Sequence, residues 1–181
     1  METVRMLNAG RFVSRGRGRH GTRVIDSYEL IYVDAGKLEM FEAGRTFRLS
    51  AGEWLLLRPG LRHGGLAAYE PQLVFYWGHF VPRGAEGGAR LEAMPSSGRS
   101  GRPGRFGEYY RLLLSELRES GPGPGADLLA ELLLLEAGRR SEGKAEKAAS
   151  GLAERARTHI RLHFDESLST ALLAEELQCS A

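Results

Sequence analysis

Three stretches of sequence carry the strongest structural signal: DSYELIYVDAG at residues 26–36, AGEWLLLRPGLRHGG at residues 51–65, and LVFYWGHF at residues 73–80. They are rich in β-branched and aromatic residues, and turn formers such as Pro59-Gly60 separate the apolar runs. Similar short runs follow turn signals at residues 38–41, 46–49 and 54–58. Strands spaced roughly 8 to 12 residues apart are typical of a sandwich or barrel, which is therefore predicted over residues 24–81.

The pattern changes after the last predicted strand. Residues 82–104 are rich in Gly, Pro, Ser and Arg and are predicted to form a loop. Apolar residues then occur at the spacing of one helix face, at Phe106, Tyr109, Tyr110, Leu113 and Leu117. Further helices are predicted over residues 126–140, over residues 144–164, and after Ser169, which is a good N-cap. We therefore expect three parts: residues 1–104, residues 105–143 and residues 144–181.

Composition indicates a globular, cytoplasmic protein. Hydrophobic residues make up 42% of the 181 residues, no apolar run approaches the roughly 20 residues that span a membrane, and the N-terminus has no secretion-signal core. The single cysteine, Cys179, excludes an intramolecular disulfide framework and a Cys-rich zinc site. Net charge is only +2, but residues 1–23 form a basic arm. This arm is interpreted as a solvated segment or a first strand with exposed arginines, and contact with phosphate is the alternative.

Two motifs in the strand region resemble those of cupins, which fold as a double-stranded β-helix, or jelly-roll, barrel. In the first cupin motif a Glu is followed after six residues by a Gly, as Glu29 and Gly36 are here. The second motif is matched, with its proline displaced by one position to Pro59, at Gly52, Gly60 and His63. The resemblance implies a mainly β domain, a cupin barrel in residues 1–104, followed by α-helices.

The three strand-rich stretches resemble one cupin branch most closely, the ligand-binding domain of AraC-family (arabinose-type) bacterial transcription regulators. Residues 125–140, GADLLAELLLLEAGRR, resemble the helix through which such domains dimerise, and residues 153–180 resemble the start of the family's DNA-binding domain. There, Leu168-Ser169 precedes the first helix of a helix-turn-helix that the chain enters but does not complete. The resemblance implies a ligand-sensing and dimerisation region with a linker helix and a truncated helix-turn-helix. The intact protein is expected to bind DNA, and no DNA-binding residue is expected within this chain.

A cupin can instead be a metal-dependent enzyme. The usual metal site takes an H-x-H pair, the Glu that follows it, and the His of the second motif, but the H-x-H positions before Glu29 fall within residues 22–25, TRVI. His20 and His79 can be recruited, although nothing in their spacing requires it. We therefore expect no catalytic residue, no metal and no cofactor, because a metal site of this type needs three convergent ligands. A metal-dependent isomerase or dioxygenase and a stand-alone sugar-binding module are the alternatives.

A pocket for a small, sugar-like molecule fits the strand region better. Side chains along residues 73–80 alternate between two apolar faces, one expected to meet the helices and one to line the barrel. A tryptophan suits stacking on a sugar ring, and by resemblance Trp77 falls where arabinose-type regulators stack their ligand. Burial in the core is the alternative for the aromatic residues. The candidate ligand-binding residues are Trp77, Phe75, His63, Arg23, His20, His79 and Tyr32.

Leucines crowd the helix predicted over residues 126–140. They form two rows, more than a narrow core-facing stripe needs, so one row can pack on the barrel while the other contacts a second copy of the chain. The alternative is an internal helix that is buried on both sides. We expect a homodimer, with contacts through Leu128, Leu129, Leu132 and Leu133.

Overall fold

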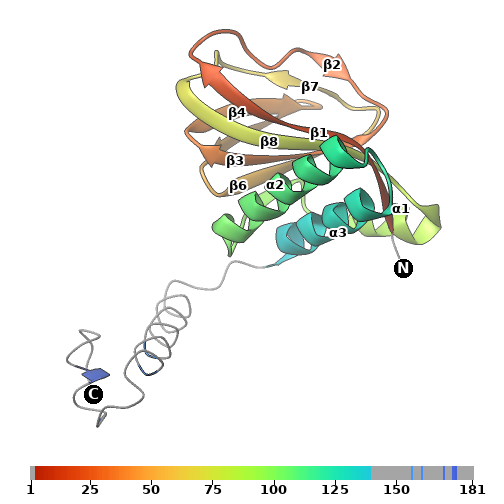
Figure 1. Cartoon of the computed structure of the whole chain (residues 1–181). Helices are drawn as coiled ribbons and strands as arrows, with labels where there is room; N and C mark the ends of the chain where they lie inside the picture. Colours follow the sequence, from red (N-terminus) through yellow and green to blue (C-terminus); the bar gives the residue numbers. More distant parts are fainter. Residues whose placement is uncertain (1–2, 140–155, 157–159, 161–168, 170–172, 175–181) are drawn as a thin grey trace. The chain divides into compact units, whose positions relative to one another are not determined.

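The structure is a computed structural model that describes residues 3–139 and, beyond them, residues 156, 160, 169, 173 and 174. The chain forms two compact units, residues 1–141 and residues 142–181, and each is described by itself. The first unit contains two antiparallel sheets that face each other as a cupin-type barrel (Figure 1). This confirms the fold that the cupin motifs implied.

The larger sheet has five strands in the order β1-β8-β3-β6-β9, and the smaller has four in the order β2-β7-β4-β5. Every strand run predicted between residues 28 and 80 is present. The strands are β1 Val4–Arg15, β2 Arg23–Val24, β3 Tyr28–Ala35, β4 Lys37–Glu42, β5 Arg45–Ser50, β6 Glu53–Leu57, β7 Arg62–Gly65, β8 Pro71–Pro82 and β9 Ser97–Arg99.

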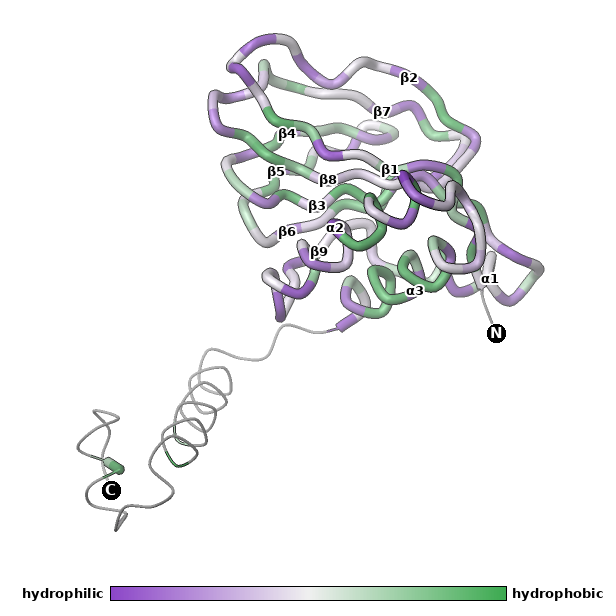
Figure 2. Tube along the Cα trace, viewed as in Figure 1, coloured by the Kyte–Doolittle hydropathy of each residue, from purple (hydrophilic) through white to green (hydrophobic). Residues whose placement is uncertain are grey.

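Alternate residues of β3 face opposite sides of the larger sheet, as strand geometry requires. Ile31 and Val33 pack between the sheets, where they join apolar side chains of β4 and β5. Leu30 and Tyr32 point the other way and pack against helices. Figure 2 shows hydrophobic segments in the strands of the larger sheet and in the helices. The two clusters of buried side chains place a core on each side of this sheet.

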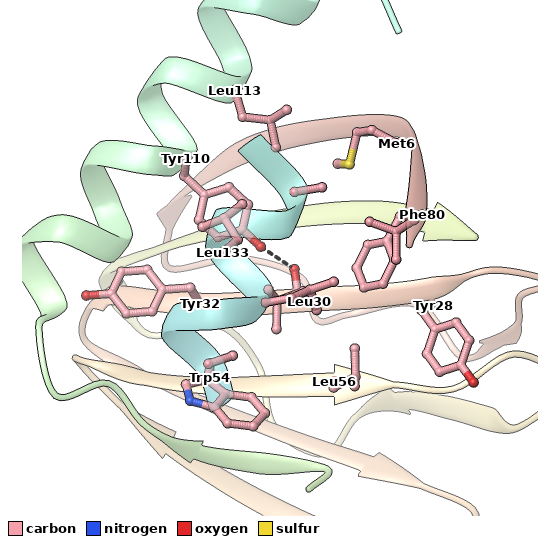
Figure 3. Close-up of a cluster of buried hydrophobic side chains, with 14 of the residues drawn as sticks. Met6, Tyr28, Leu30, Tyr32, Trp54, Leu56, Phe80, Tyr110, Leu113 and Leu133 are labelled. Carbon is pink, nitrogen blue, oxygen red and sulfur yellow. Dashed lines mark hydrogen bonds between the residues drawn. The ribbon is translucent and has the colours of Figure 1, made fainter. Parts of the chain in front are cut away.

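Three helices cover the outer face of the larger sheet: α1 Gly84–Ala93, α2 Pro103–Glu119 and α3 Pro124–Gly138 (Figure 1). Phe106, Tyr110 and Leu113 of α2 are fully buried, which confirms the predicted apolar face. The Tyr110 hydroxyl donates a hydrogen bond of 2.7 Å to the carbonyl oxygen of Leu30, on the sheet below (Figure 3). That bond satisfies a polar group that would otherwise be costly to bury.

The loop predicted over residues 82–104 is wrong, because this segment contains α1 and β9. Its glycines lower the helix propensity of the segment, and tertiary contacts provide the stability that the propensity does not. Arg58 donates hydrogen bonds of 3.0 and 2.7 Å to the carbonyl oxygens of Leu91 and Met94 at the end of α1. The end of α1 is therefore stabilised by Arg58, the residue that follows β6, and not by the helix propensity of its own residues.

The basic arm is mostly a strand. β1 pairs with β8 from Val4 to Arg15, and its three arginines, Arg5, Arg11 and Arg15, are exposed. The start of β1 is tied to α3, because the Asp127 carboxylate accepts a 2.6 Å hydrogen bond from the backbone N–H of Met6. One of the two interpretations of the arm, a first strand with exposed arginines, is therefore correct for residues 4–15.

In the second unit, Ala156 and Ile160 are helical, within the helix predicted over residues 144–164. The backbone N–H of Leu173 donates a 3.0 Å hydrogen bond to the carbonyl oxygen of Ser169, as expected where a helix begins after an N-cap. The rest of the predicted linker helix and helix-turn-helix lies outside the described residues. Within the described part of the chain, no helix combines the length and apolar character of a membrane span.

Candidate ligand pocket

A pocket of about 410 Å³ opens between the two sheets at the end of the barrel near β2. This volume is in the range of small-molecule sites. Strands β1, β2, β3 and β8, the segment between β1 and β2 and the segment between β7 and β8 line it with Asn8, Phe12, His20, Gly21, Arg23, Glu29, Tyr69, Phe75, Trp77 and His79. Part of the lining is aromatic, here called the aromatic wall, and the adjoining part is polar and ionisable, here called the polar wall.

The aromatic wall is built by close contacts between β1 and β8. The Phe12 ring lies 4.6 Å from the Tyr69 ring and 4.9 Å from the Phe75 ring, measured between centroids. Trp77 pairs across the strands with Gly10, and a Cβ added to Gly10 would come within 2.5 Å of the indole. The missing side chain at Gly10 therefore allows the Trp77 ring to lie across β1.

The polar wall centres on Glu29, whose side chain is 1% exposed. Arg23 donates a hydrogen bond of 3.3 Å to its carboxylate, and His79 Nε2 lies 3.7 Å from the same oxygen. Burial raises the pKa of Glu29 to about 7, although Arg23 opposes the rise. Burial, together with the charge of Arg23, lowers the pKa of His79 to about 4, so this imidazole is neutral at physiological pH.

Two further histidines lie beside this carboxylate. The rings of His20 and His63 are 5.8 Å apart, and neither Nε2 atom has a hydrogen-bond partner among the described residues. Burial lowers the pKa of both imidazoles, that of His20 to about 4. They approach each other because β7 ends in glycine: a Cβ on Gly65 would lie 2.8 Å from the backbone nitrogen of His20.

The structure brings five of the seven candidate ligand residues into the lining, at Trp77, Phe75, Arg23, His20 and His79. His63 is fully buried beside His20 rather than in the lining. The assignment of Tyr32 to the pocket is wrong, because this residue is buried on the helix side and its hydroxyl donates to the Pro103 carbonyl oxygen at 2.9 Å. Tyr32 is three residues from Glu29, and an odd separation along a strand places two side chains on opposite faces.

Sequence reasoning missed Asn8, Phe12 and Tyr69 as lining residues. Asn8 and Phe12 lie on β1, which arginines interrupt and which was not predicted as a definite strand. Glu29 entered only as a motif residue. The sequence signal was its separation of two from Ile31 and four from Val33, apolar residues that share its face of the strand. The structure pairs Ile31 with Trp77 across the strands.

The structure brings together a set of potential metal ligands that the motif spacing did not predict. Potential ligand atoms of His20, Glu29 and His63 lie within 4.8 Å of one another, and all three residues are buried. Two imidazoles and a carboxylate are a suitable donor set for a transition metal. His20 lies in the segment between β1 and β2, outside the H-x-H positions of the cupin motif, so the motif spacing did not predict it as a potential ligand.

Residues 10–138 match the family of the AraC-like ligand binding domain. The chain belongs to this family. It is 26% identical over 182 residues to the uncharacterized HTH-type transcriptional regulator YisR of Bacillus subtilis (strain 168), an alignment that covers 88% of the chain and 63% of the relative. The chain thus spans less than two thirds of that relative's length.

Solved structures similar to this AraC-like domain include the AraC-like transcriptional activator CuxR, with 16% identity, a TM-score of 0.43, and coverage of 86% of this chain and 58% of that one. A RmlC-like cupin from Shewanella frigidimarina NCIMB 400 is also similar, with 14% identity, a TM-score of 0.36, and coverage of 47% and 71%.

The leucine rows of the AraC-like domain separate on α3. Leu133 is 2% exposed and Leu129 packs partly against the core, whereas Leu128, Leu132 and Leu135 are exposed by 56%, 38% and 54%. The inward row secures α3 to the sheet. Any contact with a second copy of the chain would fall to the outward row, so Leu133 is placed in the core rather than at a subunit surface.

Proposed function

We propose that this AraC-like domain is the sensor of a transcription regulator and binds a small, sugar-like molecule in the pocket between its sheets. The single observation that carries the proposal is the lining: an aromatic wall that includes Trp77 adjoins a polar wall of Asn8, Arg23, Glu29 and His79. A sugar offers apolar C–H faces to aromatic rings and hydroxyl groups to directed hydrogen bonds, so both walls have a role.

A thermal-shift screen of the 181-residue chain against sugars and sugar acids tests this function. A true ligand at 100 times its Kd adds about 2.7 kcal/mol to the free energy of unfolding. Trp77→Ala should abolish the shift, Trp77→Phe should keep part of it, and Leu112→Ala, at an exposed position of α2, should leave it unchanged. A shift that survives Trp77→Ala intact would contradict the pocket assignment.

We further propose that the exposed leucines of α3 join two copies of the chain. Leu128, Leu132 and Leu135 recur at helical spacing and form an apolar strip on the outer side of α3. Ligand binding would then favour one arrangement of sensor, dimer and DNA-binding domain in the intact protein, which requires a difference in ligand affinity between the two arrangements.

Leu128→Glu combined with Leu132→Glu tests the dimer, because charges in an apolar contact oppose association. Light scattering should report a monomer whose melting temperature is close to that of the unassociated wild type. Leu112→Glu, at another half-exposed leucine, is the matched control and should remain dimeric. A wild-type chain that is monomeric at high concentration would refute this part of the proposal.

A further inference from the structure

We propose that His20, His63 and Glu29 bind one divalent transition-metal ion, of which Zn²⁺ is the representative, beside the ligand pocket. Their potential ligand atoms lie within 4.8 Å of one another, and the side chains come from three separate segments of the barrel. Ligand atoms around a tetrahedral zinc, at bond lengths of about 2.0–2.2 Å, lie roughly 3.4 Å apart. Small side-chain rotations would close the difference.

The hydrogen bonding of His63 points to a ligand. His63 Nδ1 lies 3.3 Å from the carbonyl oxygen of Leu61, an atom that can only accept, so this contact holds the proton on Nδ1. The lone pair is then on Nε2, which is buried and has no partner among the described residues. A backbone carbonyl that orients the second nitrogen of a histidine is the usual outer contact of a metal-bound imidazole.

His20 completes the same arrangement from the opposite side. It is 8% exposed, its Nε2 atom is also without a partner within the described part of the chain, and its ring is held next to that of His63 by the close packing against Gly65. Buried polar atoms without partners are rare because each costs free energy. Two such nitrogens beside one buried carboxylate are explained together by a shared cation.

Glu29 supplies negative charge, for which Arg23 competes. The Arg23 side chain is 48% exposed and makes a single contact of 3.3 Å with the carboxylate. Its guanidinium can therefore move into solvent at small cost when a metal ion takes the carboxylate. This competition predicts that removing the guanidinium strengthens metal binding, an effect opposite in sign to removing a ligand.

Three ligands would leave a coordination position open, and two of them, His20 and Glu29, also line the pocket. An oxygen atom of the small molecule can then complete the coordination. This last step rests on the proposed sensor function, whereas metal binding by the three side chains does not, so metal titration alone separates the two.

The test is calorimetric titration of the tag-free 181-residue chain with Zn²⁺, and with Co²⁺ followed by its visible absorption. His159, His163 and Cys179 are replaced by Ala, Ala and Ser in every sample, because i, i+4 histidines and a thiolate can bind zinc themselves. We expect one ion per chain. Mg²⁺, which prefers oxygen ligands, should not compete.

His20→Ala and His63→Ala should each weaken binding by about 100-fold and remove the Co²⁺ absorption, since even outer-shell changes cost 10–100-fold. Arg23→Met should strengthen binding by about threefold to tenfold. This measurement does not depend on a variant that loses a buried side chain. Thermal melts check that each variant is folded. Unchanged binding in the double variant His20→Ala/His63→Ala, or no binding to the folded parent at millimolar Zn²⁺, would overturn the proposal and leave buried water as the partner of these nitrogens.

Discussion

The two sides of the larger sheet differ in how completely their buried polar groups are paired. On the helix side, the Tyr110 hydroxyl and the Asp127 and Glu136 carboxylates are buried and all have partners. Between the sheets, His20 and His63 are equally buried but each leaves a nitrogen without a partner among the described residues. Buried polar groups that serve stability alone are expected to have hydrogen-bond partners. We therefore interpret the helix side as the structural scaffold and the side between the sheets as the functional site.

Trp54 is an exception that limits this comparison. Its Nε1 atom lies on the helix side, is buried, and also has no partner among the described residues. Among the described residues Trp54 does not belong to a cluster of potential metal ligands, and an indole N–H can only donate, whereas the two imidazoles lie next to Glu29. The functional signal is therefore the clustering of unpaired groups and not their occurrence.

The largest effect is expected from Asp127→Ala on the helix side. Asp127 is 1% exposed, accepts from the Met6 N–H at 2.6 Å, and pairs with Arg83 at 2.5 Å. Removing the carboxylate leaves the buried Met6 N–H without its side-chain acceptor. This should lower the free energy of unfolding by about 3 kcal/mol. Urea denaturation measures it.

Glu39→Ala is the control, because Glu39 pairs with Arg48 at 3.6 Å but both side chains are exposed. Its loss should cost at most about 0.5 kcal/mol. Equal effects of Asp127→Ala and Glu39→Ala would mean that the buried bonds of Asp127 stabilise the fold no more than an exposed ion pair does, and Asp127 would no longer count as part of the scaffold.

A smaller effect of opposite sign is expected between the sheets. His20→Leu and His63→Leu replace imidazoles that bear an unpaired buried nitrogen with apolar groups of similar size. Each should leave the unfolding free energy of the metal-free protein unchanged or raise it by about 1 kcal/mol, because an unsatisfied polar atom is removed. A loss of more than about 2 kcal/mol would assign that histidine to the scaffold instead.

The same contrast explains what the sequence could predict. Strands β3 to β6 and β8 were predictable because their apolar runs and turns are local signals. The start of β1 and the whole of α1 depend on distant partners, since Asp127 binds the Met6 N–H and Arg58 binds the end of α1. Local reading fails where a segment is held by tertiary contacts rather than by its own pattern.

For the site, residue type was a better guide than motif spacing. The candidate histidines, Arg23 and Trp77 were identifiable because aromatic and ionisable side chains are conspicuous among strand residues. The His20–Glu29–His63 cluster was not, because an H-x-H rule assumes that two ligands share a strand, whereas here Gly65 lets a preceding segment approach β7. Tyr32 was misplaced because its strand parity relative to Glu29 was not applied.

The smallest effect is a pH dependence on the helix side, at Glu131. Its carboxylate accepts two hydrogen bonds of 2.6 Å from Thr3 and one of 3.0 Å from the Val4 N–H, and it pairs with Arg90 at 2.5 Å. Burial alone would raise the pKa, but the bonds from Thr3 and Arg90 lower it below the ordinary value of 4.5. The folded state therefore binds its proton less readily than the unfolded state does. The stabilisation is fully present above about pH 4.5 and is lost as pH falls through the folded-state pKa.

Glu131→Gln removes that titration and serves as the test. Wild type should melt at a higher temperature than the variant at neutral pH, and the difference should shrink as pH falls below about 4.5, the pKa of the unfolded carboxyl group. Glu119→Gln, at an exposed position where the carboxylate accepts a 2.8 Å hydrogen bond from the Ser115 hydroxyl, should change the melting temperature little at any pH. A gap between wild type and Glu131→Gln that stays constant from neutral to acidic pH would mean that the bonds to Thr3 and Arg90 do not depend on the charge of Glu131. The start of β1 would then be held by packing instead of by charge-assisted pairing, and the scaffold side would lose one of the groups that define it.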